Sequence, residues 1–378
     1  MITLAFHPVD TWFFRESRPM DSIGGIALGN QFPPSPSTLM GALRTRLGDM
    51  IGLDWLQLKK STTTAPEWWG DADRPGALRL TGPWLQVDDK NYFPAPAYLL
   101  RQVQGEAYVK LIPGAPIDCD LGRVRLPSLP SNIELGVKPL EGHWVEYKPL
   151  THLLAGYDAP SKMKTLTLED FFEDEYRLGI AINHESRSVL DGQLYQTRHL
   201  RPKQEVAVMV TLDGLSPELE QQFQQSLAVN PLVRLGGEGR MAEIKVRPTS
   251  QQFLLSSKQS KNARLLAVAL TDIPVTDLSW PLPGFVRQSK EDGSVCWQGE
   301  LGGEALTLVS MATPKVRRQG GWDLVRHQSR PVRSMIPAGS VFYFNQTTLN
   351  QQSLHVGNDT AWGYGHLALG WWNDTLKG

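Results

Sequence analysis

The sequence has few cysteines and no long hydrophobic run. Cys119 and Cys296 are the two cysteines among 378 residues, and no CxxC or Cys/His cluster indicates a zinc site. We therefore expect two reduced, buried thiols rather than a disulfide framework. The longest apolar runs, such as residues 265–270, have the length of a strand, far short of the about 18 residues of a spanning helix. No signal segment follows Met1, so the sequence predicts a soluble cytoplasmic protein without a membrane partner.

The charge also lacks an excess of one sign. Lys and Arg number 38 and Asp and Glu number 39, which gives a formal net charge of −1. This balance excludes a histone-like polycation but allows a local basic surface, because net charge averages over all faces. The 12 tryptophans are a high number. Large aromatic side chains usually fill cores and interfaces, but they also stack on bases or sugars.

Motifs of the common enzyme classes are missing. The glycine-rich loops at residues 235–240 and 362–370 lack the P-loop pattern GxxxxGK[ST]. Both loops precede predicted strands, whereas a dinucleotide's pyrophosphate needs a following helix. GxSxG and HExxH are absent too. We therefore expect no catalytic residue, cofactor or metal. His184 and His199 remain candidates for general acid–base cleavage of RNA, although a structural histidine is the commoner case.

Two helices have clear start signals. Ser35 is a predicted N-cap with a proline after it, and Ser216 with its following proline repeats the pattern for a helix over residues 217–228. Leucines at every fourth position from 39 to 47 give the first helix an apolar stripe. A third, short helix is predicted over residues 167–176, with Thr167 as its cap and acidic residues in its first turn.

The order of the elements predicts an α+β protein. Strands are predicted from Ile2 (at an edge or half-buried) and over residues 205–212, 241–246, 264–271, 306–311 and 341–344. Strand, helix, insertions, strand, helix, glycine-rich loop and strand is the order of a split βαβ, ferredoxin-like unit. The remainder repeats part of that order. We expect two ferredoxin-like (RRM-like) units, over residues 1–255 and 256–378, with long insertions at about 53–165.

Two basic segments favour RNA as a partner. Residues 315–333 contain six Lys or Arg against one Asp, and a second cluster lies within residues 187–203. Arginine forks suit phosphate oxygens, and Trp322 offers a face for stacking. Glycines let a backbone approach an anion closely and point its N–H groups at it. The alternatives left open are solvated basic faces and glycine turns that pack one domain on another.

Several stretches resemble one family. They include residues 11–19 (TWFFRESRP), 32–44 (FPPSPSTLMGALR), 235–240 (LGGEGR) and 336–341 (IPAGSV), and shorter matches continue in the same order to Gly363–Gly365. In these stretches the sequence resembles the third subunit of the Cmr complex, the type III-B CRISPR effector, within the RAMP superfamily. The resemblance covers nearly the whole chain except residues 53–165.

The resemblance implies ferredoxin-like RAMP folding and a non-catalytic role in antiviral defence. Such a subunit holds the 5′ handle of the CRISPR RNA, docks on the large polymerase/cyclase-like subunit and abuts the first backbone RAMP subunit. The alternative is a RAMP endoribonuclease that processes precursor CRISPR RNA; a glycan-binding all-β module is disfavoured by the uneven strand spacing. The residues predicted to contact RNA are Arg15, Arg18, Ser35, Ser37, Arg44, Arg187, Arg198, Gly236, Gly237, Gly239, Arg240, Lys315, Arg317, Arg318, Trp322, Gly363, Gly365 and His366.

Overall fold

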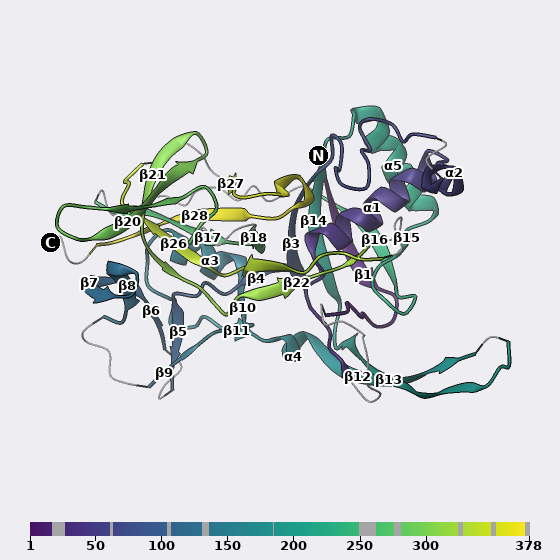
Figure 1. Cartoon of the computed structure of the whole chain (residues 1–378), viewed down its shortest axis with the longest axis horizontal. Coiled ribbons are helices and arrows are strands. Elements are labelled where there is room, and N and C mark those ends of the chain that lie inside the picture. Colours follow the sequence, from purple (N-terminus) through teal and green to yellow (C-terminus); the bar gives the residue numbers. More distant parts are fainter. Residues whose placement is uncertain are drawn as a thin grey trace. The chain divides into compact units, whose positions relative to one another are not determined.

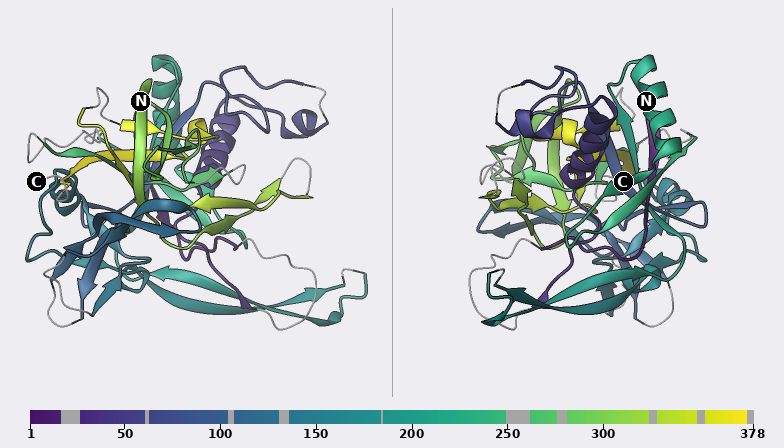
Figure 2. Two further views of the ribbon diagram at one scale, coloured as in Figure 1. Left: turned by 60° about the vertical axis from the view of Figure 1, so that its left-hand side comes forward. Right: turned by 90° about the vertical axis from the view of Figure 1, so that its right-hand side faces the viewer.

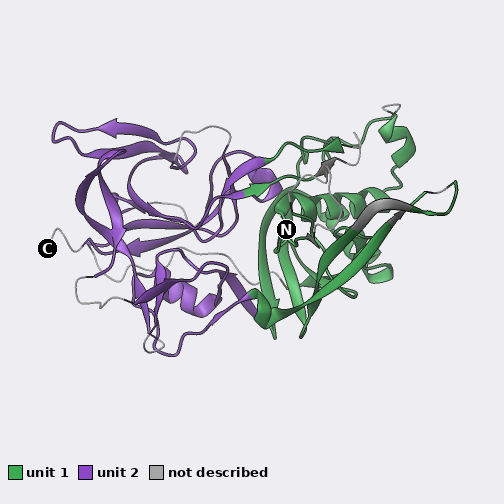
Figure 3. Cartoon of the chain, turned by 60° about the horizontal axis from the view of Figure 1, so that its bottom comes forward, with its two compact units in different colours: residues 1–89, 168–249, 318–332 green, residues 90–167, 250–317, 333–378 purple. Residues whose placement is uncertain are grey.

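The protein forms two compact units (Figure 3). The computed structural model describes residues 1–16, 27–60, 63–103, 107–130, 136–183, 185–248, 262–275, 281–323, 328–348 and 353–374. Unit 1 comprises residues 1–89, 168–249 and 318–332, and unit 2 comprises residues 90–167, 250–317 and 333–378. Each unit is therefore assembled from three separate segments of the chain. The boundary predicted between residues 255 and 256 lies outside the described residues.

Unit 1 combines a sheet, helices and a long antiparallel ribbon to which a short third strand is added (Figure 1). Its elements are β1 (Ile2–Pro8), β2 (Ala27–Leu28), α1 (Pro36–Met50), α2 (Trp55–Lys59), β3 (Arg79–Val87), α4 (Leu168–Phe171), β12 (Phe172–Ile182), β13 (Val189–Pro202), β14 (Val206–Asp213), α5 (Pro217–Val229), β15 (Leu232–Arg234), β16 (Met241–Arg247), β23 (Trp322–Asp323) and β24 (Gln328–Ser329). Its sheet strands follow the order β3-β14-β1-β16-β15, and each neighbouring pair is antiparallel. The helix predicted to begin after Ser35 and the predictions for residues 205–212, 217–228 and 241–246 are confirmed.

The two long helices of unit 1 cover one face of its sheet. Ser35 caps α1 by accepting a hydrogen bond from the Thr38 N–H, and Ser216 caps α5 in the same way. Each cap stabilises its helix by about 1 kcal/mol. The predicted leucine stripe of α1 is fully buried, as are Phe223 and Leu227 of α5. Because α1 contacts β3, β15 and α5, and α5 contacts β16, both helices lie on the same side of the sheet.

Unit 2 is built mainly from strands. Its elements are β4 (Lys90–Pro94), β5 (Leu99–Gln102), β6 (Tyr108–Lys110), β7 (Ile112–Cys119), β8 (Gly122–Ser128), β9 (Val137–Pro139), β10 (Trp144–Glu146), α3 (Tyr147–Leu154), β11 (Thr165–Leu166), β17 (Arg264–Ala269), β18 (Ile273–Val275), β19 (Val286–Ser289), β20 (Val295–Leu301), β21 (Glu304–Ala312), β25 (Arg333–Ile336), β26 (Val341–Phe344), β27 (Ser353–His355), η1 (Thr360–Trp362) and β28 (His366–Trp372). β22 (Arg317–Gln319) runs across the point where the chain passes from unit 2 to unit 1. The strands predicted near residues 264, 306 and 341 are confirmed.

The main sheet of unit 2 has seven strands in the order β19-β20-β21-β26-β17-β28-β27. Its core includes Leu265, Phe342 and Leu367 from the adjacent strands β17, β26 and β28, together with other apolar side chains. Helix α3 contacts β28. Gly370 of β28 lies so close to α3 that an added Cβ would stand 2.6 Å from the Leu154 carbonyl oxygen. A side chain at residue 370 would therefore push α3 off the sheet.

The structure corrects four local predictions. Strand β1 is central and buried rather than at an edge, because β14 and β16 pair with its two sides. Residues 79–87, expected within insertions, supply β3, which pairs with β14. The helix predicted over residues 167–176 ends at Phe171, and the ribbon strand β12 follows at once. Cys119 is exposed, whereas Cys296 is buried as predicted, and both are free thiols.

Candidate nucleic-acid interface

The ribbon formed by β12 and β13 in unit 1 has different side chains on its two faces: charged residues lie on one face and exposed apolar residues lie on the other. β12 and β13 pair in antiparallel register, with Glu175 opposite His199 and Arg177 opposite Thr197. Opposed residues share a face, so the odd-numbered residues from 173 to 179 and from 195 to 201 lie together. The other face of β12 exposes Tyr176, Leu178, Ile180 and Ile182. Figure 2 shows how far this ribbon extends from the rest of unit 1.

Three arginines converge on one carboxylate at the base of the ribbon. Asp10, two residues after β1, accepts hydrogen bonds from Arg177 and Arg240, and its other oxygen pairs with Arg201; each N–O distance is 3.0 Å. Glu175 pairs with Arg177 and Arg201, each at 2.5 Å. We call Arg177, Arg201 and Arg240 the arginine cluster. Its side chains are partly exposed, and three guanidinium groups facing two carboxylates leave one net positive charge.

The carboxylates stay ionised within this network. Hydrogen bonds from Arg177 and then Arg201 lower the pKa of Asp10 below its ordinary value. The same two arginines, Arg201 first, lower the pKa of Glu175. Salt bridges at such exposed positions stabilise a fold by less than about 1 kcal/mol. The network therefore fixes where the guanidinium groups point more than it stabilises unit 1.

The glycine-rich loop before β16 directs Arg240 into this network. The Gly237 N–H donates to the Phe13 carbonyl at 2.8 Å, and the Arg240 N–H donates to the Gly237 carbonyl at 3.1 Å. Gly236 has a φ of +103°, and an added Cβ would stand 2.6 Å from the Phe13 oxygen. These two N–H groups are used within the protein. The loop also sets the orientation of Arg240, which donates to Thr11 as well as to Asp10.

His199 lies beneath the arginine cluster and is buried. Its Nδ1 is 3.1 Å from the Thr11 hydroxyl, its Nε2 is 3.1 Å from the Thr197 hydroxyl, and its ring stacks on Phe13 with centroids 5.0 Å apart. Burial, followed by the charges of Arg177 and Arg240, lowers the pKa of His199. A neutral imidazole with both nitrogens occupied is poorly suited to act as a general acid or base. His184 lies outside the described residues.

Other predicted contacts have different surroundings. Ser35 and Ser37 hydroxyls lie 3.0 Å apart at the start of α1. Arg44 is buried: it stacks 4.0 Å over the Trp69 ring and donates to the Trp69 and Asp71 carbonyls, and burial lowers its pKa to about 10. Arg44 thus braces the loop that holds Trp69, and its guanidinium group is not part of the candidate interface.

Arginines elsewhere in unit 1 are more accessible. Arg187 is exposed at the turn of the ribbon with a φ of +52°. Arg198 pairs with Asp174 at 2.7 Å on the ribbon's apolar face. Arg15 is exposed, and its backbone forms an isolated antiparallel β-bridge with Asn30. Arg18 lies outside the described residues. The ribbon therefore brings Arg187, Arg198 and the arginine cluster onto one structural element and its base.

The second basic segment and the second glycine loop complete the predicted set. Lys315 and Arg318 are exposed and Arg317 is partly exposed. The backbone of Trp322 belongs to β23, but its side chain lies outside the described part of the chain. Gly363 and Gly365, in unit 2, lie in a turn that ends at the buried His366. Of these residues, Arg318 and Trp322 belong to unit 1, as the arginine cluster does, and the others belong to unit 2.

Two members of the network carry no signal in the sequence that marks them as part of a site. No sequence pattern gives Asp10 or Glu175 a binding role. Arg177 lies in one of the shorter matches to the family, residues 177–180, and Arg201 lies in the second basic cluster. If residues 172–182 are recognised as a strand, Glu175 and Arg177 fall on one face, because side chains alternate along a strand. The pairing of Glu173 with Arg201 then adds Arg201 to that face. Nothing local in the sequence points to Asp10.

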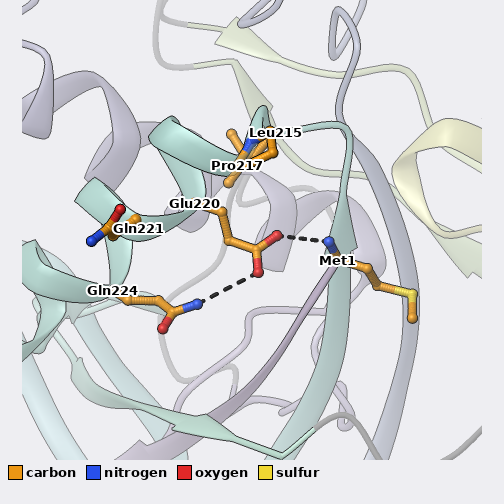
Figure 4. Close-up of a pocket in the computed structure, with 6 residues that line it drawn as sticks. All are labelled: Met1, Leu215, Pro217, Glu220, Gln221 and Gln224. Carbon is orange, nitrogen blue, oxygen red and sulfur yellow. Dashed lines mark hydrogen bonds and ion pairs between the residues drawn. The ribbon is translucent and has the colours of Figure 1, made fainter.

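A small pocket elsewhere in unit 1 is lined by Met1, Leu215, Pro217, Glu220, Gln221 and Gln224 (Figure 4). The Met1 amino group donates to Glu220 at 2.7 Å, and this bond raises the pKa of the amino group. No predicted RNA contact lines this pocket, so it is separate from the candidate interface. Among the described residues no cluster of His, Cys, Asp or Glu could hold a metal ion. In the same part of the chain, no helix is both long and apolar enough to cross a membrane.

The helices and many strands of the two units define a strand-rich α+β protein. The chain belongs to the family CRISPR-associated protein (Cas_Cmr3), whose model matches residues 4–372. The predicted membership of the type III-B Cmr effector, and of its third-subunit family, is thereby confirmed. No curated protein matches this sequence.

Three solved structures from CRISPR complexes match this chain to different degrees. A chain of the type III-B Cmr-beta complex bound to cognate target RNA and AMPPnP is 16% identical with a TM-score of 0.50; the match covers 90% of this chain and 86% of that chain. The same complex bound to target RNA matches at 18% identity and a TM-score of 0.49, with the same coverage. The type III-A Csm3–Csm4 subcomplex matches at 12% identity and 0.41, covering 99% and 100%. At these identities the first match supports the fold alone.

Proposed function

We propose that this Cmr subunit is a non-catalytic RNA-binding scaffold that holds the 5′ handle of the CRISPR RNA. The observation that carries the proposal is the arginine cluster at the base of the ribbon. Guanidinium groups bind phosphate oxygens in pairs of parallel hydrogen bonds, and an RNA backbone presents such oxygens at regular spacing. Arg187, exposed at the turn of the ribbon, extends the positive charge along it, whereas Arg198 lies on the opposite, apolar face and pairs with Asp174. The cluster's single net positive charge suits weak binding by the subunit alone and firmer binding within a shared channel.

Both units are proposed to be ferredoxin-like. In unit 1 the four strands around the two helices follow the order β16-β1-β14-β3, which is 4-1-3-2 in chain order. In unit 2 the central strands follow β28-β17-β26-β21, again 4-1-3-2 if β17 is counted first. The shared order supports an internal duplication, with the helices of the second unit replaced by other connections.

Protein docking is proposed on a different surface from RNA binding. The large polymerase/cyclase-like subunit and the first backbone RAMP subunit remain the proposed partners. The exposed face of Tyr176, Leu178 and Ile180 supports this part of the proposal, because contiguous apolar side chains on a surface mark macromolecular contacts. Leu178→Ser with Ile180→Ser should reduce incorporation into the reconstituted complex, measured by co-purification; full incorporation would remove this face from the docking surface.

The alternative, an endoribonuclease that processes precursor CRISPR RNA, has less support. Its candidate base His199 is buried between two hydroxyl groups and a phenylalanine ring. Incubation of the protein with labelled precursor RNA separates the two functions. Intact RNA agrees with the scaffold, whereas specific cleavage that His199→Ala abolishes would overturn it.

The test of the scaffold function is charge reversal. Arg187→Glu and Arg240→Glu should each weaken binding of the handle by the reconstituted complex. Each should also lower the slope of log K against log salt by about 0.7 for every phosphate that the complex no longer neutralises. Lys60→Glu, an exposed position just after α2 in the same unit, makes the same charge change away from the ribbon. Unchanged affinity and slope for both arginine variants would reject the handle-binding proposal.

A further inference from the structure

Asp10 is placed unusually for a surface carboxylate, because it is shared by three arginines from three elements. Arg177 comes from β12, Arg201 from β13 and Arg240 from the loop before β16, and each lies 3.0 Å from a carboxylate oxygen of Asp10. Asp10 itself is 44% exposed. An exposed ion pair contributes little to folding, so stability alone does not account for this convergence.

The chemistry of this position is that of a phosphate site. A carboxylate and a phosphate both present anionic oxygens to which guanidinium forks donate. Asp10 therefore stands where the cluster would otherwise receive an anion from outside. Glu175 pairs with Arg177 and Arg201, at 2.5 Å from each. Arg240 donates instead to Asp10 and to the Thr11 hydroxyl, so Asp10 is the carboxylate that joins all three arginines.

We propose that Asp10 is an internal phosphate mimic. In the RNA-free protein it holds the arginine cluster in position, and it competes with the RNA backbone for the same guanidinium groups. A phosphate that binds the cluster takes over hydrogen bonds from Asp10 and leaves that carboxylate to water. Asp10 thus lowers the affinity of the free subunit for arbitrary single-stranded RNA. This inference rests on the proposed function, since it requires that the cluster face RNA.

The experiment removes the charge while keeping the shape. Asp10→Asn in the full chain should raise the affinity for a short labelled oligouridylate by roughly fivefold, which is the equivalent of one screened charge pair. Fluorescence anisotropy at low salt measures this affinity. The dependence on salt should become steeper, because an additional phosphate contact releases additional counterions. Asp10→Glu, which retains the charge, should bind like the unaltered protein. Glu175→Gln should give a smaller gain, because Glu175 engages two arginines.

The controls separate this mechanism from long-range charge and from folding. Asp120→Asn makes the same charge change on an exposed turn of unit 2 and should leave affinity within about twofold of the unaltered protein. A purely structural role of Asp10 predicts lower affinity together with a lower thermal midpoint, and that result would overturn the proposal. If Asp10→Asn does not fold, Glu175→Gln becomes the deciding variant, and no gain there rejects the mimic.

Failure of the inference and failure of the proposed function give different results. Arg240→Ala weakens RNA binding if the cluster contacts RNA. If Arg240→Ala weakens binding but Asp10→Asn does not strengthen it, the scaffold function stands and the phosphate mimic is rejected. If neither variant changes binding, the arginine cluster does not face RNA, and both are rejected.

Discussion

The two glycine-rich loops both let two backbone segments approach closely, but the residues that follow them have different surroundings. Gly236 has a φ of +103°, and its added Cβ would stand 2.6 Å from the Phe13 oxygen; Gly365 has a φ of +70°, and its added Cβ would stand 1.9 Å from the Val356 oxygen. Each loop also uses an N–H within the protein, to bond Phe13 in unit 1 and Asp272 in unit 2. In both loops, glycine marks the close approach of two backbones.

The residue that follows each loop makes the difference. In unit 1 it is Arg240, which reaches the partly exposed network around Asp10. In unit 2 it is His366, which is buried and stacks on His355 with ring centroids 4.8 Å apart. The same backbone arrangement therefore presents an accessible cation in one unit and a core residue in the other. Glycine spacing alone does not distinguish these outcomes.

The largest effect is expected from Gly365→Ala. Its Cβ would overlap a carbonyl oxygen, and the left-handed backbone adds strain, so unit 2 should lose about 3 kcal/mol or more of its free energy of unfolding. Gly303→Ala is the matched control in the same unit: its φ is +80° but no atom lies within 4 Å of the added Cβ, so about 1 kcal/mol is expected. Urea denaturation measures both. Equal losses would mean that the close approach to Val356 is absent.

Gly236→Ala should destabilise unit 1 by about 2 kcal/mol, because the added Cβ would collide with the Phe13 carbonyl and the backbone would have to shift to accommodate it. Gly41→Ala, inside α1 with open space around it, should instead stabilise the same unit by about 1 kcal/mol through helix propensity. The thermal midpoints of the two variants should therefore move in opposite directions. A neutral Gly236→Ala would show that the close approach to the Phe13 carbonyl is absent.

The sequence was informative where local rules decide. The caps at Ser35 and Ser216 follow from contacts within a few residues, and the leucine spacing of α1 and the short apolar run at residues 341–344 are patterns that the sequence displays directly. The motifs spread along the chain also sufficed to recognise the family.

Long-range contacts account for what the sequence could not reveal. The helix signals after Thr167 were overridden because β12 pairs with β13 along most of its length. The sequence predicts that Arg44 binds phosphate, but in the structure Trp69, 25 residues away, stacks on its guanidinium group. The network around Asp10 joins β1's end to residues 177, 201 and 240, and no local pattern predicts such a convergence.

The buried histidine of unit 2 should make that unit sensitive to acid. Burial, with a smaller contribution from His355, lowers the pKa of His366 from 6.5 to about 3. Above pH 6.5 the histidine is neutral in both folded and unfolded chains. As the pH falls below 6.5 only the unfolded chain takes up the proton, so stability falls, by about 2 kcal/mol at pH 5. His366→Gln should flatten the change in urea midpoint between pH 7.5 and pH 5; an equally steep change would assign the acid sensitivity to other groups.

The smallest expected effects separate the contribution of the loop glycine to folding from the contribution of the following arginine to RNA binding. Gly239→Ala changes a left-handed residue with no atom within 4 Å of the new Cβ, so unit 1 should lose about 1 kcal/mol while RNA affinity stays unchanged. Arg240→Ala, one residue later, removes a partly exposed ion pair that stabilises the fold by about 1 kcal/mol, but it should lower RNA affinity several-fold. Unfolding and anisotropy measurements on both variants test this. The contrary result is that Gly239→Ala weakens RNA binding as much as Arg240→Ala while the protein stays fully folded. The loop backbone itself would then contact the RNA, and the assignment of Gly239 to folding and of Arg240 to binding would be wrong.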